Sequence, residues 1–178
     1  MGGIYHQDSD NLFVNCLCYD NTLYGLYASG NNNDLSYCES SDNGDYGILI
    51  DGNNPSLLHC IIRNNVGYGC KIIGATSNFQ IQHSTFEENQ EGLIIEDCAN
   101  GEIGHCTIAH NNLDPFYYSS GLLLDTSINT IIHSNIIEDN YNGILLLSNS
   151  HDNEIRDCRI QASRMYGIYV INLSLIHI

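Results

Sequence analysis

Glycine recurs along this chain at intervals close to 22 residues. Successive glycines of the main column are 22, 22, 22, 23, 29, 22 and 24 residues apart. They are Gly3, Gly25, Gly47, Gly69, Gly92, Gly121, Gly143 and Gly167. Self-similarity at such a period is typical of a solenoid, in which each repeat forms one coil stacked on the previous one.

Apolar residues alternate with other residues after each glycine. The position one place after the glycine holds Ile4, Leu26, Ile48, Cys70, Leu93, Leu122, Ile144 and Ile168. Alternation with period two predicts a short strand whose apolar side chains point inward. Two more apolar columns, represented by Leu57 and Ile62, predict two further strands per repeat. Three strands and three bends per coil predict an all-β, single-stranded parallel β-helix with three sides. The bias of parallel crossovers favours right-handed winding.

Polar residues form columns in the same register. One column holds Asn21, Asn43, Asn65, Asn89, Asn111, Asn140 and Ser163. Stacked asparagines hydrogen-bond to one another, and asparagine tolerates the left-handed backbone of tight bends. Another column, which includes Cys38 and Cys60, places five of the eight cysteines at inward positions. We therefore expect buried, reduced thiols rather than a disulfide framework.

Several segments combine all of these features. They include GILIDGNN from Gly47, NYNGILLL from Asn140, CIIRNN from Cys60 and NIIEDN from Asn135. These segments resemble right-handed parallel β-helix repeats of the pectate-lyase-like superfamily, of mannuronan epimerases and of NosD-type periplasmic proteins. The resemblance implies the fold and an extracellular, cell-surface or periplasmic location. It implies no single activity, because one scaffold carries many unrelated sites.

The repeat covers residues 1–172, which form one domain that we expect to be incomplete at both ends. Residues 173–178 leave the repeat, and we interpret them as an artefact at the end of a gene fragment. The formal charge is −16 with only five basic residues, which argues against nucleic acid as a partner. The sequence shows no signal peptide and no membrane span.

Candidate chemistry lies on the outward positions of the strand after each glycine. Glu96 and Asp125 occupy the same outward column in consecutive coils, so we expect them about 5 Å apart. Such a pair could act in catalysis or, with Asp97, bind Ca²⁺. Lys71 is a candidate to neutralise a substrate carboxylate or to form an ion pair. Asp51, in the same column as Glu96, is a candidate for substrate binding.

The one long coil inserts about seven residues between 111 and 120. Loops on a rigid scaffold are common places for binding, and this one leads into the strand of Asp125. Asp114 is a candidate base or cation ligand. Tyr117 and Tyr118 are candidates to stack on sugar rings. The alternative is that the aromatic residues only pack the loop against the solenoid.

The match to known enzymes is incomplete. Mannuronan epimerases carry an Asp-Pro-His-Glu motif, whereas this chain has Asp-Pro-Phe-Tyr from Asp114. Pectate lyases use an arginine base near calcium, but Arg63 lies on a different strand from Glu96. Catalysis therefore stays open; a polysaccharide lyase, hydrolase or epimerase is the expectation if the protein is an enzyme.

The main hypothesis is a module that binds or modifies a polysaccharide or cell-surface glycan, with Ca²⁺ as the possible cofactor. A second hypothesis is a non-catalytic solenoid that docks a protein or a second copy. It rests on the outward apolar stripe of Leu49, Ile94, Leu123 and Leu145. A third is NosD-type metal handling by stacked histidines, although parallel rings suit a single metal poorly and favour a surface role. These histidines are His59, His83 and His105.

Overall fold

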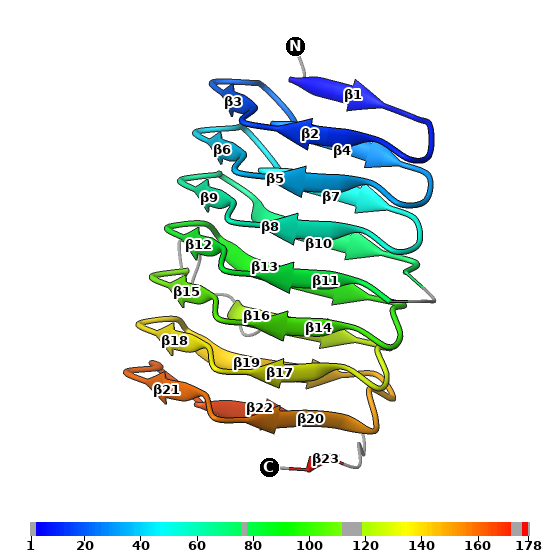
Figure 1. Cartoon of the computed structure of the whole chain (residues 1–178). Helices are drawn as coiled ribbons and strands as arrows, with labels where there is room; N and C mark the ends of the chain where they lie inside the picture. Colours follow the sequence, from blue (N-terminus) through cyan, green and yellow to red (C-terminus); the bar gives the residue numbers. More distant parts are fainter. Residues whose placement is uncertain (1–2, 76–77, 112–118, 172–175, 178) are drawn as a thin grey trace.

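The chain folds into a stack of coils with three parallel β-sheets as its sides (Figure 1). The computed structural model describes residues 3–75, 78–111, 119–171 and 176–177. Each coil adds one strand to each sheet in turn, and the two ends of the chain lie at opposite ends of the stack (Figure 1). This confirms the predicted three-sided parallel solenoid.

Sheet 1 contains the strands that follow the column glycines. Its strands are β1 (Ile4–His6), β4 (Leu26–Ser29), β7 (Ile48–Asp51), β10 (Tyr68–Ile73), β13 (Glu91–Glu96), β16 (Ser120–Asp125), β19 (Asn142–Leu147) and β22 (Ile168–Val170). Those of sheet 2 are β2 (Leu12–Val14), β5 (Asp34–Ser36), β8 (Ser56–Leu58), β11 (Gln80–Gln82), β14 (Glu102–Gly104), β17 (Ile131–His133), β20 (Asn153–Arg156) and β23 (Ile176–His177). Those of sheet 3 are β3 (Leu17–Tyr19), β6 (Glu39–Ser41), β9 (Ile61–Arg63), β12 (Thr85–Glu87), β15 (Thr107–Ala109), β18 (Ile136–Glu138) and β21 (Arg159–Gln161).

The strands pair in the register that the repeat predicts. Leu26 pairs with Ile48 one coil on, and Leu93 pairs with Leu122 across the longest step. The extra residues of the long coil therefore leave the register of β16 unchanged. Within the described residues there is no α-helix, and thus none that could cross a membrane.

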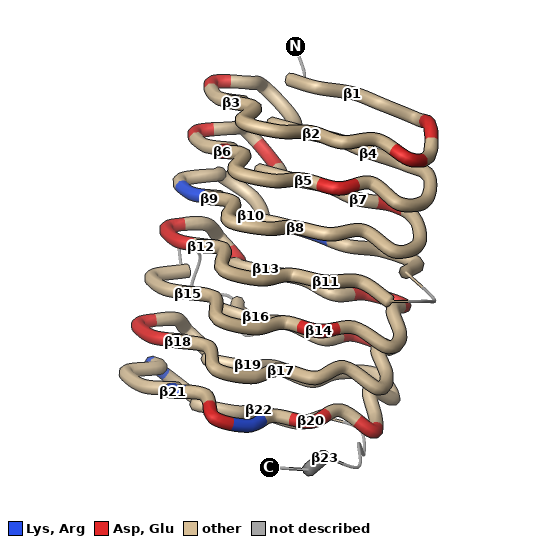
Figure 2. Tube along the Cα trace, viewed as in Figure 1, with Lys and Arg blue, Asp and Glu red and all other residues tan. Residues whose placement is uncertain are grey.

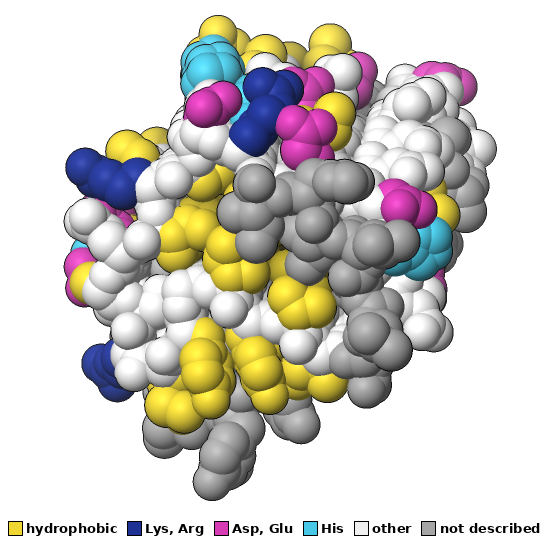
Figure 3. Space-filling model, turned by 90° about the horizontal axis from the view of Figure 1, so that it is seen from below, with side chains coloured by type: hydrophobic (Ala, Val, Ile, Leu, Met, Phe, Trp, Pro, Cys, Tyr) yellow, Lys and Arg dark blue, Asp and Glu magenta, His cyan; other side chains and the backbone are white. Residues whose placement is uncertain are grey.

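The core fills the interior of the triangle from all three sheets. Ile50 of sheet 1, Leu57 of sheet 2 and Ile62 of sheet 3 are fully buried. Two aromatic rings, Phe79 and Phe86, are also enclosed. Each such side chain stabilises the fold by about 1.5–3 kcal/mol relative to exposure. Seen along the axis in Figure 3, hydrophobic side chains lie towards the middle of the coil and charged side chains lie around its rim.

The column glycines are required by close contact rather than by backbone angle. A Cβ on Gly47 would lie 2.6 Å from Asn65 Nδ2 and 2.6 Å from the carbonyl oxygen of Gly69. Among the described glycines, positive φ occurs only at Gly30, Gly52 and Gly74, outside this column. Left-handed backbone falls mainly on other residues of the bends, such as Asn32, whose φ is 56°.

The asparagine ladder is present. Asn65 Nδ2 donates to Asn89 Oδ1 over 3.0 Å, and the backbone N–H of Asn65 donates to the same oxygen over 3.0 Å. Asn89 in turn donates to Asn111 Oδ1 and to the carbonyl of Ile62. The side chains are fully buried, so each amide supplies partners that water cannot. The ladder links coil to coil along one corner of the solenoid.

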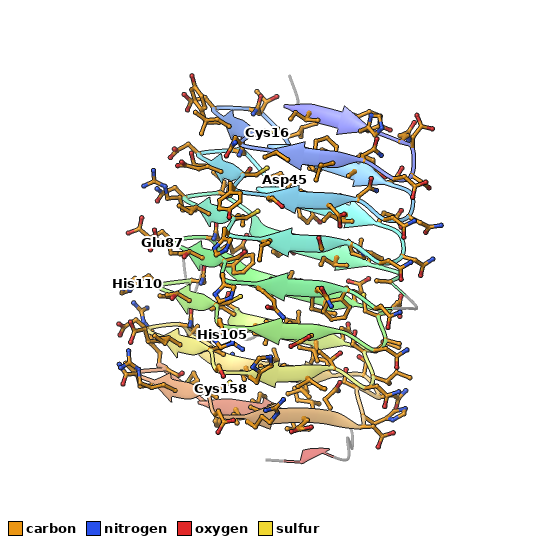
Figure 4. The ribbon with its side chains drawn as sticks, viewed as in Figure 1. Cys16, Asp45, Glu87, His105, His110 and Cys158 are labelled. Atoms are coloured by element: carbon orange, nitrogen blue, oxygen red, sulfur yellow. The ribbon has the colours of Figure 1, made fainter. Side chains whose placement is uncertain are left out.

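The cysteines are reduced, as predicted. All eight are free, and four of the inward column donate to backbone carbonyls of the preceding coil, namely Cys38, Cys60, Cys106 and Cys158. Cys60 Sγ, for example, donates to Leu35 O over 3.6 Å. Burial raises the pKa of Cys106 to about 11, which keeps this thiol protonated and unreactive. The column runs almost the full length of the stack, from Cys16 to Cys158 (Figure 4).

Charge is spread along the solenoid rather than gathered in one place. Figure 2 shows acidic residues in coils from one end of the stack to the other and basic residues at few positions. The Arg63 guanidinium lies 2.8 Å from Glu39 Oε1 on the outer face of sheet 3. This places Arg63 on a different side of the solenoid from Glu96, as the repeat predicts.

Replacing Asn89 by alanine tests the ladder. We expect Asn89→Ala to lower the free energy of unfolding by about 3 kcal/mol, because it leaves buried donors of Asn65 and the Ile62 carbonyl unpaired. The matched control is Asn129→Gly, at an exposed bend where φ is 52° and glycine fits the backbone. Urea unfolding of both variants would contradict the prediction if their midpoints shifted equally.

Candidate functional site

The outer face of sheet 1 carries the polar residues that the sequence singled out. Glu96 of β13 pairs directly with Asp125 of β16, which confirms that the two carboxylates occupy neighbouring coils. Asp51 pairs with Ile73, and Ile73 pairs with Glu96. Asp51 is therefore separated from Glu96 by an apolar residue and does not join the acidic pair.

Lys71 reaches the acidic pair from the preceding coil. Its Nζ lies 2.6 Å from Glu96 Oε2, and its side chain is only 16% exposed. Lys71 is also the one basic residue in the eight described strands of sheet 1. Of the two roles considered for Lys71, the ion pair is the one that the structure shows.

The predicted cation ligands do not converge into a cluster. Asp97 follows β13 at an exposed bend with φ of 52°, whereas Glu96 and Asp125 lie within strands. Asp125 Oδ1 accepts a hydrogen bond from Thr126 Oγ1 over 3.3 Å. Across the described part of the chain, no three His, Cys, Asp or Glu side chains group in a way that could hold a metal ion. Calcium binding by Glu96, Asp97 and Asp125 thus stays a prediction.

Three further candidates lie outside the described residues. Asp114, Tyr117 and Tyr118 belong to residues 112–118, between β15 and β16. Their predicted roles as a base and as sugar-stacking rings stay predictions.

A row of tyrosines on the same face was missed by the sequence analysis. The ring centroids of Tyr24 and Tyr46 are 5.5 Å apart, and those of Tyr46 and Tyr68 are 5.0 Å apart. The rings are tilted by 46° and 55° to one another, so they do not cover each other's faces fully. Burial, helped by the nearby Asp45 carboxylate, raises the pKa of Tyr46 to about 12. The signal was available, because each tyrosine directly precedes a column glycine.

Glu91 continues this column and was also missed. It pairs with Tyr68 of the preceding coil. Burial raises the pKa of Glu91 to about 7, and the Lys71 charge only partly offsets that rise. Its Oε2 atom is buried and has no hydrogen-bond partner among the described residues. A carboxyl group that changes protonation near neutral pH is a candidate general acid or base.

The apolar stripe is outward but largely covered. Ile94 is 4% exposed and Leu145 is fully buried, although both lie outside the main core. The expectation of a continuous exposed stripe is therefore wrong at these two positions. Leu49 and Leu123 keep partial exposure.

The histidines stack on the surface at the bend between sheets 2 and 3, where Figure 4 labels His105. Ring centroids are 5.0 Å apart for His59 and His83 and 4.9 Å apart for His83 and His105. All three residues have φ between 52° and 57°, a backbone region in which histidine is enriched. The bend geometry explains the histidines without a metal, and the nearly parallel rings agree with the predicted surface role.

Comparison with known families identifies the fold. The profile described as right handed beta helix region matches residues 1–86 and 75–178. The chain belongs to this right-handed β-helix family. Comparison with curated protein sequences gives no significant match.

Solved structures with this fold are distant in sequence. The periplasmic alginate epimerase AlgG superposes with a TM-score of 0.73 at 12% identity, over 97% of this chain and 46% of that one. The A-module of the Azotobacter vinelandii mannuronan C-5 epimerase AlgE4 gives 0.72 at 12% identity, over 98% and 56%. Pectate lyase Pel9A gives 0.58 at 11% identity, over 90% and 50%. The chain spans about half the length of these structures.

The pKa of Glu91 predicts a pH dependence of stability. The unfolded carboxyl titrates near its ordinary value of 4.5, whereas the folded one titrates at about 7. Between these values the folded state binds the proton more tightly. Stability therefore falls by up to about 3 kcal/mol as the pH rises through this window, and the loss is complete above it.

Glu91→Gln should remove that contribution. We expect this variant to become more stable than wild type above pH 7 and to match it most closely below pH 4.5. Thermal unfolding in EDTA across this range measures the difference, with Glu87→Gln on sheet 3 as a control for removing one carboxylate. A constant difference between Glu91→Gln and wild type at all pH values would contradict the pKa shift.

Proposed function

We propose that this chain is a carbohydrate-directed module that binds a polysaccharide across the outer face of sheet 1. The observation that carries the proposal is the tyrosine row of Tyr24, Tyr46 and Tyr68, which leads to the Lys71–Glu96 ion pair on the same face. Aromatic rings pack against the apolar surfaces of sugars, while their hydroxyl groups form hydrogen bonds. A row of rings spaced at one per coil suits an extended, repeating ligand.

The structural neighbours support this class of ligand. Their names identify epimerases of alginate and mannuronan and a lyase of pectate, so each is named for a polysaccharide. Because the chain spans about half of each neighbour, and identity is 11–12%, the likeness establishes the fold alone. The sugar specificity rests on the residues of this face.

The same face holds groups for acid–base chemistry. Lys71 is positioned to turn from Glu96 to a substrate carboxylate, which would release Glu96 beside Asp125. Together with Asp114, these residues are the candidates for a lyase, hydrolase or epimerase reaction. Tyr117, Tyr118 and Asp51 are the candidates for holding neighbouring sugars.

Bound Ca²⁺ would allow this face to bind an acidic polysaccharide. The chain carries a formal charge of −16, which repels polyanions. Ca²⁺ held by Glu96, Asp97 and Asp125 would bridge the protein to sugar carboxylates. A location outside the cytoplasm, at the cell surface or in the periplasm, fits this ligand and the neighbour that is named periplasmic.

Loss of the tyrosine rings tests glycan binding. We expect the Tyr46→Ala/Tyr68→Ala double variant to lose about tenfold or more in affinity, since each aromatic contact contributes about 0.5–1.5 kcal/mol. Affinity electrophoresis in gels containing alginate, polygalacturonate or a neutral glucan, with and without Ca²⁺, measures the effect. Tyr19→Ala, an exposed tyrosine on sheet 3, is the matched control. No retardation of wild type in any gel would overturn the proposed function.

The calcium part of the proposal has its own test. Calorimetric titration with Ca²⁺ should show at least one fewer bound ion in a Glu96→Gln/Asp125→Asn double variant than in wild type, because both strand carboxylates are removed. The control is a Glu39→Gln/Glu138→Gln variant, which removes the same number of charges from ion pairs on sheet 3. Equal binding by the double variant and the control would exclude Glu96 and Asp125 as ligands.

A further inference from the structure

In three consecutive coils, the column of tyrosines holds residues of other types. The residue directly before the column glycine is tyrosine at Tyr24, Tyr46, Tyr68 and Tyr166. In the coils between Tyr68 and Tyr166 this position holds Glu91, Ser120 and Asn142. A column of half-buried rings is thus interrupted by one carboxylate, one hydroxyl and one amide.

The three side chains lie in neighbouring coils. Tyr68 pairs with Glu91, and Ser120 pairs with Asn142. Leu93 pairs with Leu122, which lies 29 residues later; Glu91 and Ser120 have the same separation two residues earlier, and therefore occupy neighbouring positions on β13 and β16. Neighbouring strands are about 4.8 Å apart, so Ser120 lies between the two longer side chains.

Each of the three side chains presents an oxygen that lacks a partner. Glu91 Oε2, Ser120 Oγ and Asn142 Oδ1 are buried, and none has a hydrogen-bond partner in the described part of the chain. Ser120 is 0% exposed and Asn142 is 1% exposed. The amide of Asn142 is oriented by a hydrogen bond from its Nδ2 to Ser119 O over 3.0 Å, which leaves Oδ1 as the free atom.

Unpaired buried oxygens are costly. Each one loses about 1–3 kcal/mol relative to a paired group, and more when it is charged. The nearest ammonium, that of Lys71, is already 2.6 Å from Glu96. The Glu91 carboxylate and the Asn142 amide oxygen cannot donate to one another, and Ser120 has a single hydroxyl proton, so the group lacks further donors or a positive charge.

We infer that Glu91, Ser120 and Asn142 bind a hard cation, of which Ca²⁺ is the natural example, and that the ion joins strands β13, β16 and β19. Carboxylate, hydroxyl and amide oxygens are the ligands that such ions take, and water completes the shell. A bridging water would supply hydrogen bonds, whereas a cation would also stabilise Glu91 in its charged form. The site is separate from the Glu96, Asp97 and Asp125 set, and it requires no glycan.

The position of the site gives it a structural role. The step from Glu91 to Ser120 is the longest in the repeat, and the two strands are joined through the long coil. An ion shared by three coils would hold β13, β16 and β19 together where the connection is longest. With a single carboxylate, the affinity is expected to be modest, since affinity follows the charge of the ligand set.

Terbium luminescence tests the site directly. Tb³⁺ replaces Ca²⁺ at oxygen sites and is sensitised by nearby aromatic rings; the chain has 12 tyrosines and no tryptophan. We expect saturable luminescence that Ca²⁺ competes away, with affinity at least tenfold lower in Glu91→Gln and several-fold lower in Asn142→Ala and Ser120→Ala. The matched control is the Glu96→Gln/Asp125→Asn variant, which should keep this signal.

A variant with increased affinity for Tb³⁺ would show that the weaker binding of the other variants is due to a lost ligand and not to misfolding. Asn142→Asp adds a second carboxylate at the site, so its affinity for Tb³⁺ should rise several-fold, and Ca²⁺ should raise its Tm more than that of wild type. Circular dichroism of each variant verifies the fold. The inference is overturned by equal affinity in wild type, Glu91→Gln and Asn142→Asp, or by loss of the signal in the Glu96→Gln/Asp125→Asn control. Glycan binding in gels can succeed or fail independently of either result.

Discussion

The fixed hydrogen-bond register between coils is the constraint on which this structure depends. Backbone groups of one coil bond to those of the next, as in the bonds from Leu26 N to Gly47 O and from Thr107 N to Ser84 O. A strand that slipped by one residue would turn every apolar side chain outward. Because the register is kept even across the longest step, each position becomes a column that runs along the solenoid. The burial and contacts of a residue therefore depend on the column to which it belongs.

Stacking at one strand spacing decides which residues a column tolerates. Amides suit a buried column because each is both donor and acceptor, and the ladder from Asn43 to Asn140 uses both functions. Flat rings suit the surface bends, as in the stack of His59, His83 and His105. Like charges in one column repel, and Glu96 beside Asp125 is an exception that Lys71 offsets from the preceding coil. Departures from a column's usual residue are thus informative.

The outer face of sheet 1 is where such departures gather. Tyrosine gives way to Glu91, Ser120 and Asn142 in one column, and an apolar column is interrupted by Lys71. These substitutions carry a local cost, since Glu91 loses hydration and Ser120 and Asn142 keep unpaired oxygens within the described structure. Proteins accept such costs mainly at functional or strained positions.

The sequence by itself determined the architecture, because a solenoid is defined by local repetition. The glycine and apolar columns predicted three strands per coil, the register of Glu96 with Asp125, the asparagine ladder, the free thiols and the surface stack of His59, His83 and His105. The tertiary structure decided what depends on neighbours in space. It showed that Lys71 forms an ion pair with Glu96 and that Asp51 is separated from Glu96. It also showed that Ile94 and Leu145 are buried, and that the column glycines are required because a side chain there would clash with neighbouring atoms. It also revealed Glu91, because burial and the absence of a partner are properties of the packed molecule and not of any single residue.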